Sequence, residues 1–331
     1  MRLLKTMRYL LSAFTLLVLT LGTNACAQND YAHQPSSLAF IAQMVEKHGF
    51  DKQKLTAVFA QAQRRDDIIS TMQRPAEGKP WFEYRPIFLT QQRIDGGIAF
   101  WNNHEALLDK ASREYGVPPQ IIIAIIGVET RYGANTGRYP VLDAISTLAF
   151  DYPPRSAFFL GELESFLLLT REQNLNPNEL LGSYAGAIGL PQFIPTSYRK
   201  YAVDFDHDGK IDLWNSTADV IGSVANYLST FGWQKGQPIA VPATVTGTQH
   251  QLLLDADLEP KSSVQEILGA GVSANLTVAG NTPARLLQLK GEYADEYWVS
   301  LQNFYVITRY NHSSLYAMAV FQLSEAIRSQ R

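Results

Sequence analysis

The chain contains one cysteine among its 331 residues, and its six histidines are scattered. A single cysteine excludes an intramolecular disulfide, so the fold must be held by a hydrophobic core and by bound ligands. The sequence also lacks an HExxH motif, a paired-cysteine ligand set and a nucleophile elbow, which mark many metallohydrolases and serine hydrolases. These two classes of enzyme therefore have no support in the sequence.

The composition is that of a globular protein, with 46% hydrophobic and 18% charged residues and enough length for two domains. Residues 1–27 contain three basic and no acidic residues, so the rest of the chain has 25 basic against 31 acidic residues and a net charge of −6. An acidic surplus argues against nucleic acid as a partner.

The first 27 residues have the pattern of an export signal. Three basic residues precede an apolar stretch, residues 9–21, that is too short for a membrane span. Residues 25–27 fit a cleavage site with small residues. Cys26 also fits the lipid-modified first residue of a bacterial lipoprotein, although Thr23 stands where such signals usually carry leucine. A lone cysteine at this place favours lipid attachment, and we expect a periplasmic protein anchored to the outer membrane.

Helical spacing of apolar residues covers most of the chain, and strand patterns are confined to its C-terminal third. The spacing predicts helices within 37–62, broken at 48–49, and at 96–115, 118–132, 141–150, 156–174, 218–231 and 313–328. Segments rich in β-branched and aromatic residues predict strands within 239–247, 284–291 and 296–311. The segment 74–88, rich in proline and aromatic residues, predicts irregular structure. The fold class is therefore mainly α, with a small β element (α+β).

The segment 121–133, IIIAIIGVETRYG, places a glutamate in an apolar run that predicts a buried helix. Near the C-terminal end of such a helix, desolvation and the helix dipole both disfavour the ionised form of Glu129. A carboxyl group held protonated near neutral pH is what a general acid for glycosidic bond cleavage requires. The alternative is a structural glutamate paired with Arg131 or Arg138, which is the more frequent role for an arbitrary buried glutamate.

A glycine-rich segment, SYAGAIGLPQFIPTSY at 183–198, carries Ser183, Tyr184 and Gln192 among apolar residues. Its glycines allow the backbone to approach another surface closely. Hydroxyl, amide and aromatic groups suit a sugar, which needs hydrogen-bond partners and stacking faces. The alternative is a tight turn between helices, in which the glycines serve packing alone.

Six segments together resemble a known family. In order along the chain they are GVETRYG, YPPRSAFF, SYAGAIGLPQF, DFDHDGKIDLW, GSVANYL and RYNHSSLYAMAV. From about Trp81 to the C-terminus, this series resembles the membrane-bound lytic murein transglycosylase B family. The resemblance implies a lysozyme-like catalytic core at 96–237, flanked by an N-terminal helical region at 28–95 and by a β element with a C-terminal helix at 238–331.

The resemblance also implies the reaction and the residues that carry it out. The enzyme would cleave the MurNAc-GlcNAc β-1,4 bond of peptidoglycan and form 1,6-anhydro-MurNAc ends, with Glu129 as the single catalytic acid and base and with help from the substrate's own N-acetyl group. The substrate-cleft positions that match the family are Tyr84, Arg155, Ser183, Gln192, Tyr227, Tyr310, Asn311 and Tyr316. Pro154 stands where the family usually has the first of two arginines, so any contact of that side chain is lost or displaced.

The acidic segment 204–215, DFDHDGKIDLWN, matches an EF-hand loop at most positions. It predicts a structural Ca²⁺ site formed by Asp204, Asp206, Asp208 and the backbone carbonyl of Lys210. Asn215 stands where such loops carry a bidentate glutamate, and the resemblance supplies Asp219 from the next helix as the closing ligand. The alternative is an exposed acidic turn without a metal.

Two other functions stay open at this level. A hydrolysing muramidase would use water and commonly a second carboxylate, for which Asp143 and Asp151 are nearby in sequence but in no compelling arrangement. A non-catalytic scaffold that binds peptidoglycan would tolerate the loss of Glu129, whereas here Glu129 is retained within the matching motifs. The partners expected are peptidoglycan strands, the outer membrane through the lipid anchor, and cell-wall synthases as a class of protein partner.

Overall fold

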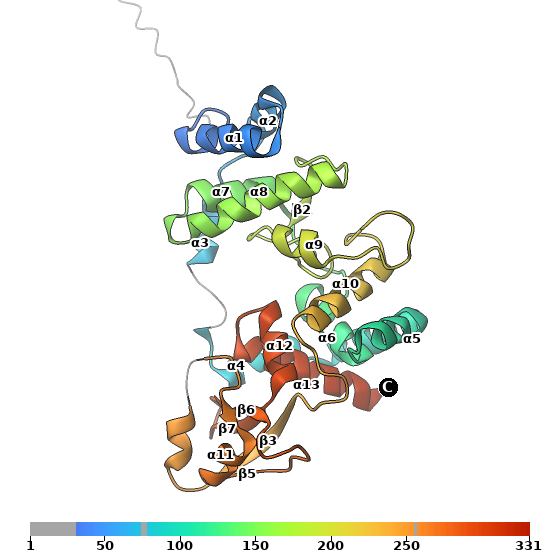
Figure 1. Cartoon of the computed structure of the whole chain (residues 1–331), viewed down its shortest axis with the longest axis vertical. Coiled ribbons are helices and arrows are strands. Elements are labelled where there is room, and N and C mark those ends of the chain that lie inside the picture. The colour runs from blue at the N-terminus through green and yellow to red at the C-terminus, as the bar shows by residue number, and fades with distance from the viewer. Residues whose placement is uncertain (1–30, 74–77, 255–256) are drawn as a thin grey trace, which may run out of the picture.

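The computed structural model describes residues 31–73, 78–254 and 257–331, and it is elongated (Figure 1). The export signal and Cys26 lie outside these residues. Within the described part, no helix is both long and apolar enough to cross a membrane. Helices α1 and α2 lie at one end of the molecule and a β-sheet with α11 lies at the other, with most of the remaining helices between them (Figure 1).

The N-terminal helices pack on a helical pair from the middle of the chain. Helices α1 (Pro35–His48) and α2 (Lys52–Phe59) confirm the predicted pair with a break at Gly49. Together with α3 (Asp66–Met72), they lie beside α7 (Val141–Phe150) and α8 (Ser156–Glu172) (Figure 1). The rings of Phe40 and Phe59 each meet Phe150, at centroid distances of 6.0 and 6.1 Å. This contact places α7 and α8 under the N-terminal helices.

Residues 81–88 form helix α4 (Trp81–Phe88), so the prediction of irregular structure for this segment was wrong. Trp81, Tyr84 and Phe88 fall on one face of the helix, with ring centroids 6.4 and 5.1 Å apart along the series. Burial of this aromatic face outweighs the hydrogen bond that Pro86 cannot donate. Helix α4 packs against α13, so it lies far from the α1–α3 group although it follows it in sequence (Figure 1).

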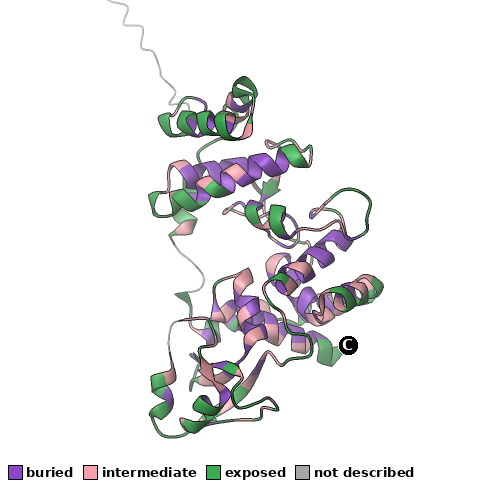
Figure 2. Ribbon diagram, viewed as in Figure 1, coloured by how far each residue is buried: buried purple, intermediate pink, exposed green. Residues whose placement is uncertain are grey.

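The centre of the molecule is built around α6 (Pro119–Thr130), which packs against α5 (Gln91–Tyr115), α10 (Thr217–Thr230) and α13 (Ser314–Gln330). Every residue of α6 from 121 to 128 is buried, which confirms the predicted buried helix. Figure 2 shows that buried residues also concentrate along α7, α8 and α10. The short helix α9 (Pro195–Tyr201) connects α8 to α10 by packing against both.

A five-stranded antiparallel sheet has the order β4-β6-β7-β3-β5. Its strands are β3 (Ala240–Val245), β4 (Ser262–Ser263), β5 (Val272–Ala274), β6 (Pro283–Leu289) and β7 (Glu296–Ser300). With α11 (Val264–Gly269), the sheet encloses a second, smaller core that includes Ile267, Leu286 and Val299. This region confirms the predicted β element near the C-terminus.

The strand predicted over 296–311 is correct only for its first five residues. The chain ends β7 at Ser300 and forms α12 (Gln302–Tyr310). Phe304 and Ile307 lie one helical turn apart and are buried together, and the buried amide of Asn303 bonds to Gln234 and Gln237. Aromatic and β-branched content predicted a strand, but these tertiary contacts select the helix.

Candidate active site

Glu129 lies in the last turn of α6, where the backbone changes direction abruptly. Arg131 and Tyr132 adopt left-handed φ angles of 52° and 61°, a conformation that costs most residues about 1–2 kcal/mol. Thr130 holds this turn, because its Oγ1 donates to the carbonyl of Leu190 at 2.9 Å and accepts from the amide of Gly133 at 3.1 Å. The end of the glutamate helix is thereby joined to the glycine-rich segment.

Three tyrosines form a series beside Glu129. Tyr316 donates from its hydroxyl to Glu129 Oε1 at 2.6 Å, and its ring stacks on Tyr310 with centroids 6.5 Å apart and an interplanar angle of 9°. Tyr310 in turn lies 4.8 Å from the ring of Tyr227. The three residues come from α13, α12 and α10, so the site exists only when these helices have packed around α6.

The tyrosine hydroxyls are fixed by hydrogen bonds to the backbone. Tyr310 donates to the carbonyl of Pro191 at 2.6 Å, and Tyr227 donates to the carbonyl of Arg309 at 2.5 Å. Burial raises the pKa of each tyrosine above its ordinary value. The hydroxyls therefore stay neutral, and Tyr316 acts toward Glu129 as a donor.

The electrostatics of Glu129 are dominated by desolvation. Burial raises the pKa of its carboxyl from 4.5 to about 7, and the hydrogen bond from Tyr316 opposes part of this rise. Among the described residues, neither Arg131 nor Arg138 forms an ion pair with this carboxyl. Glu129 can therefore hold a proton near neutral pH and still has a donor that stabilises its ionised form.

The glycine-rich segment is packed tightly and its predicted residues are partly engaged. Ser183 accepts from the amides of Ala185 and Ala187 at 3.3 and 3.0 Å. Gln192, with a left-handed φ of 53°, donates to the carbonyls of Thr136 and Gly189 at 3.1 and 2.8 Å. These bonds hold the loop against the turn after α6. Tyr184 is exposed at the surface of the loop.

The other predicted substrate residues are distributed unevenly around this centre. Tyr84 is buried on α4 and its side chain is close enough to raise the pKa of Tyr316. Asn311 is half-buried at the end of α12. Arg155 is exposed before α8, where its guanidinium lies 4.5 and 5.1 Å from the rings of Phe158 and Phe159. The described contacts of Arg155 are thus within its own segment.

The two carboxylates considered for a muramidase contact the N-terminal segment. Asp143 accepts from the amide of Gln63 at 2.9 Å. Asp151 accepts from the hydroxyl of Tyr31 at 2.6 Å and lies 3.5 Å from the guanidinium of Arg64. Both carboxylates therefore have structural partners, and the described contacts place neither of them beside Glu129.

A buried carboxylate that the sequence analysis did not identify is Glu162 on α8. It is 3% exposed, and its oxygens accept from the Thr196 hydroxyl at 2.6 Å and from the Thr196 amide at 3.0 Å. Burial raises its pKa. In the sequence, the one feature that could have identified Glu162 was a charged residue on the apolar face of a predicted helix. Its contacts indicate that it fixes α9 to α8.

In the acidic loop, carboxylate oxygens of Asp204, Asp206 and Asp219 lie within 4.8 Å of one another. Asp219 is 1% exposed and accepts from the amides of Phe205 and Asp212, both at 2.8 Å. Burial, together with the charges of Asp206 and Asp204, raises the pKa of Asp219. Three converging carboxylates supply the hard oxygen donors that a Ca²⁺ ion prefers. Asp208 is exposed and accepts from the amide of Lys210 at 2.9 Å, so its place as a ligand remains a prediction.

Comparison with known proteins shows extensive similarity along the chain. Residues 33–325 match the family described as the transglycosylase SLT domain. The membrane-bound lytic murein transglycosylase B of Escherichia coli K12 is 44% identical over 312 residues, which cover 91% of this chain and 85% of that protein.

Solved structures are similar over the same length. A catenated form of lytic transglycosylase SltB1 from Pseudomonas aeruginosa is 46% identical, with a TM-score of 0.87 over 91% of this chain and 99% of that one. The Escherichia coli lytic transglycosylase Slt35, solved in complex with calcium, is 44% identical, with a TM-score of 0.85 over 92% of this chain and 96% of that one. The fold prediction of a lysozyme-like, mainly helical protein is confirmed.

The raised pKa of Glu129 predicts a pH dependence of stability. The unfolded chain loses this proton near pH 4.5 and the folded chain near pH 7, so the free energy of unfolding falls as the pH rises through this interval. The loss is on the order of 3 kcal/mol at most, since each tenfold change in acidity is worth about 1.4 kcal/mol. Glu129→Gln has no such proton, and we expect urea unfolding to show that its stability relative to wild type increases between pH 4.5 and pH 8.

Glu46→Gln, at an exposed position on α1, is the control for a lost negative charge and should follow the wild type at both pH values. If Glu129→Gln also follows the wild type, the carboxyl is not desolvated in the folded protein.

Proposed function

The chain belongs to the lytic transglycosylase family with the transglycosylase SLT domain, and we propose that Glu129 is its sole catalytic acid and base. The protein is a peptidoglycan lytic transglycosylase: it cleaves the MurNAc-GlcNAc β-1,4 bond and leaves 1,6-anhydro-MurNAc ends. The proposal concerns which groups of this chain perform that reaction.

The observation that carries the proposal is the state of the Glu129 carboxyl, which combines a pKa of about 7 with a 2.6 Å hydrogen bond from Tyr316. The protonated carboxyl donates to the glycosidic oxygen as the bond breaks. The N-acetyl group of the substrate stabilises the cationic carbon, and the Tyr316 hydroxyl stabilises the carboxylate that has formed. That carboxylate then takes the proton of the MurNAc 6-hydroxyl, which closes the anhydro ring and restores the acid.

Within the described part of the chain, the contacts of the two carboxylates considered for water activation favour this intramolecular route. Asp143 and Asp151 are bonded to the N-terminal segment, so neither supports a hydrolytic mechanism. The 6-hydroxyl is tethered to the reacting sugar, and a held nucleophile gains a high effective concentration over free water. One carboxyl is then sufficient for both proton transfers.

The tyrosines and the glycine-rich loop form the proposed glycan cleft. Half-buried Tyr310 would offer its ring to the glycan near the carboxyl, whereas Tyr316, Tyr227 and Tyr84 are buried and would support the wall of the cleft. Exposed Tyr184 offers a further ring at the loop surface. Aromatic faces of this kind suit sugar rings. We propose Ser183, Gln192, Asn311 and Arg155 as polar contacts of the glycan along the same cleft.

Glu129→Gln keeps the shape of the side chain and removes its ionisable proton. We expect turnover of purified sacculi to fall by the hundredfold or more that loss of a general acid causes, with a folded protein by circular dichroism. Glu46→Gln should retain wild-type turnover. Near-normal activity in a folded Glu129→Gln protein would remove Glu129 from the mechanism.

We also propose that the acidic loop binds one structural Ca²⁺ ion. Asp204, Asp206 and Asp219 would hold it, with Asp208 and the Lys210 carbonyl as further ligands. Support comes from the converging carboxylates and from the similar Slt35 structure, which was solved with calcium. Asp219 also bonds to the amides of Phe205 and Asp212, so a bound ion would fix both ends of the loop to α10.

An ion that binds only the folded protein raises the free energy of unfolding by about 2.7 kcal/mol at a hundredfold excess over its Kd. We therefore expect the melting temperature to rise with calcium and to fall after treatment with a chelator. Asp206→Asn should remove most of the difference, whereas Asp109→Asn, at an exposed position on α5, should retain it. Identical melting of the wild type in calcium and after chelation would refute the site.

We propose that Cys26 is lipid-modified and anchors the enzyme to the periplasmic face of the outer membrane, where cell-wall synthases are the class of partner to test. Support comes from its place at the end of the signal and from the membrane-bound relative in Escherichia coli. Cys26→Ala should move the protein from the membrane to the soluble fraction. A variant that stays in the membrane fraction would contradict the anchor.

A further inference from the structure

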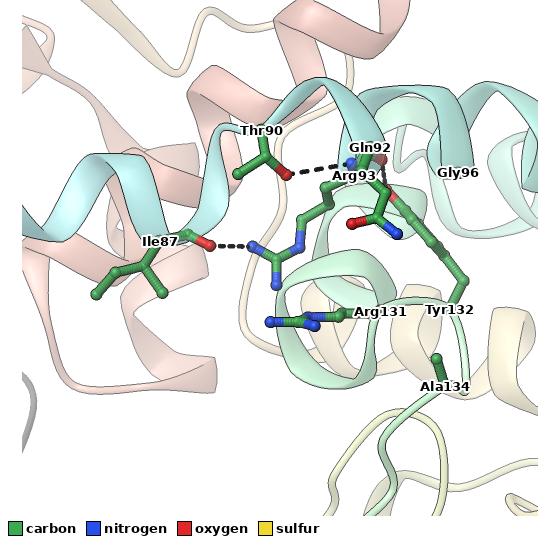
Figure 3. A pocket seen from close by; sticks show the side chains of 8 residues that line it. All are labelled: Ile87, Thr90, Gln92, Arg93, Gly96, Arg131, Tyr132 and Ala134. Atoms are coloured by element: carbon green, nitrogen blue, oxygen red, sulfur yellow. Dashed lines mark hydrogen bonds between the residues drawn. The ribbon is translucent and has the colours of Figure 1, made fainter.

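A cavity of about 460 Å³ lies between the start of α5 and the turn that follows α6 (Figure 3). Its polar lining comes from Thr90, Gln92, Arg93 and Arg131, and Ile87 at the end of α4 closes one side. Arg131 is two residues beyond Glu129, and Ile87 is one helical turn beyond Tyr84. The cavity therefore adjoins the end of the helix that carries Glu129 and the end of the helix that carries Tyr84.

Arg93 is buried in this cavity without a counter-ion. It is 7% exposed, and Nη1 donates to the carbonyl of Ile87 at 2.6 Å while the guanidinium lies 5.1 Å from the ring of Phe88. The buried Nε has no hydrogen-bond partner. Among the described residues, no carboxylate forms an ion pair with Arg93. A buried cation that contacts only neutral groups is costly unless an anion completes the site.

A second guanidinium increases the positive charge. Arg131 is exposed, and Figure 3 shows its guanidinium facing that of Arg93 across the cavity. Burial, followed by the charge of Arg131, lowers the pKa of Arg93. In the described part of the chain, Arg131 also has no carboxylate partner. Packing alone would not bring two like charges together, so the arrangement indicates a bound anion.

The surrounding residues hold the pocket rigidly. The ring of Tyr132 lies against Gly127 and Gly97, where an added Cβ would come within 2.5 and 2.7 Å of the Tyr132 hydroxyl. That hydroxyl donates to the carbonyl of Arg93 at 2.8 Å. The turn that carries Arg131 is thus fixed to the helix that carries Arg93.

We propose that this arginine pocket binds a carboxylate of the peptide stem of peptidoglycan while the glycan lies at Glu129. Paired guanidinium groups match a carboxylate through several charge-assisted hydrogen bonds. The stem peptides supply such carboxylates on the substrate itself, next to the bond that is cleaved. The inference rests on the proposed function, and it makes Arg93 and Arg131 determinants of preference for peptide-bearing glycan.

The test measures binding in the Glu129→Gln protein, so that cleavage does not intervene. Calorimetry compares GlcNAc-MurNAc carrying its stem peptide with the same disaccharide without peptide. We expect Arg131→Gln to weaken binding of the peptide-bearing ligand about tenfold and to change binding of the peptide-free ligand less than twofold. Arg113→Gln, an exposed position on α5, removes the same charge elsewhere and should leave both affinities unchanged.

Three other outcomes would overturn the proposal. Equal losses for both ligands would assign Arg131 to the glycan cleft, and no loss for either would leave the pocket without a substrate role. Displacement of the peptide-bearing ligand by millimolar inorganic phosphate to the same extent as by the free stem peptide would indicate a general anion site. Binding is measured without turnover, so it also separates the pocket from the proposed function. A wild-type protein that binds both ligands tightly but does not cleave the glycan would contradict the proposed catalysis and would leave the arginine pocket unaffected.

Discussion

Desolvation of one carboxyl is the constraint on which the rest of the structure depends. Glu129 terminates a helix whose residues from 121 to 128 are all buried, and burial moves its pKa close to 7 despite an opposing hydrogen bond from Tyr316. The Glu129 side chain is half-buried, and its partial shielding from water depends on the packing of α5, α10 and α13 around α6. The tyrosines that those helices and α12 bring to the site are a consequence of the same packing. The raised pKa of Glu129 and the central core therefore have one physical origin.

A continuous series of backbone contacts links this carboxyl to the acidic loop. Thr130 bonds to the carbonyl of Leu190, and the amide of Leu190 donates to the carbonyl of Leu213 at 2.9 Å. Gly189 has a φ of 70°, and a Cβ added at this position would clash with the carbonyl oxygen of Leu213. A side chain there would therefore separate the two loops. An ion held by the aspartates would stabilise the strip of backbone that borders the glycan cleft. A structural cation at this place would support the proposed cleft without touching the substrate.

Features with local causes were predictable from the sequence, and features with tertiary causes were not. The apolar run, its proline start and its terminal glutamate defined α6 and Glu129, and the spacing of aspartates defined the acidic loop. The helix α4 was missed because its proline suggested a break, while its stability comes from contacts with α13. The helical form of 302–310 was missed because its composition resembles a strand. Arg93 on α5 and Arg131 in the turn after α6 are brought together by tertiary packing. No local sequence pattern indicates that they are neighbours.

The central claim is that one carboxyl serves both proton transfers and that the substrate supplies its own nucleophile. Mass analysis of sacculus digests made in water enriched in heavy oxygen tests it most directly. We expect fragments that end in 1,6-anhydro-MurNAc and are lighter by one water than hydrolysis products. These fragments should have no reducing end and should carry no heavy oxygen. Mainly reducing MurNAc ends that carry heavy oxygen would contradict the intramolecular reaction, because such ends require a group that activates water.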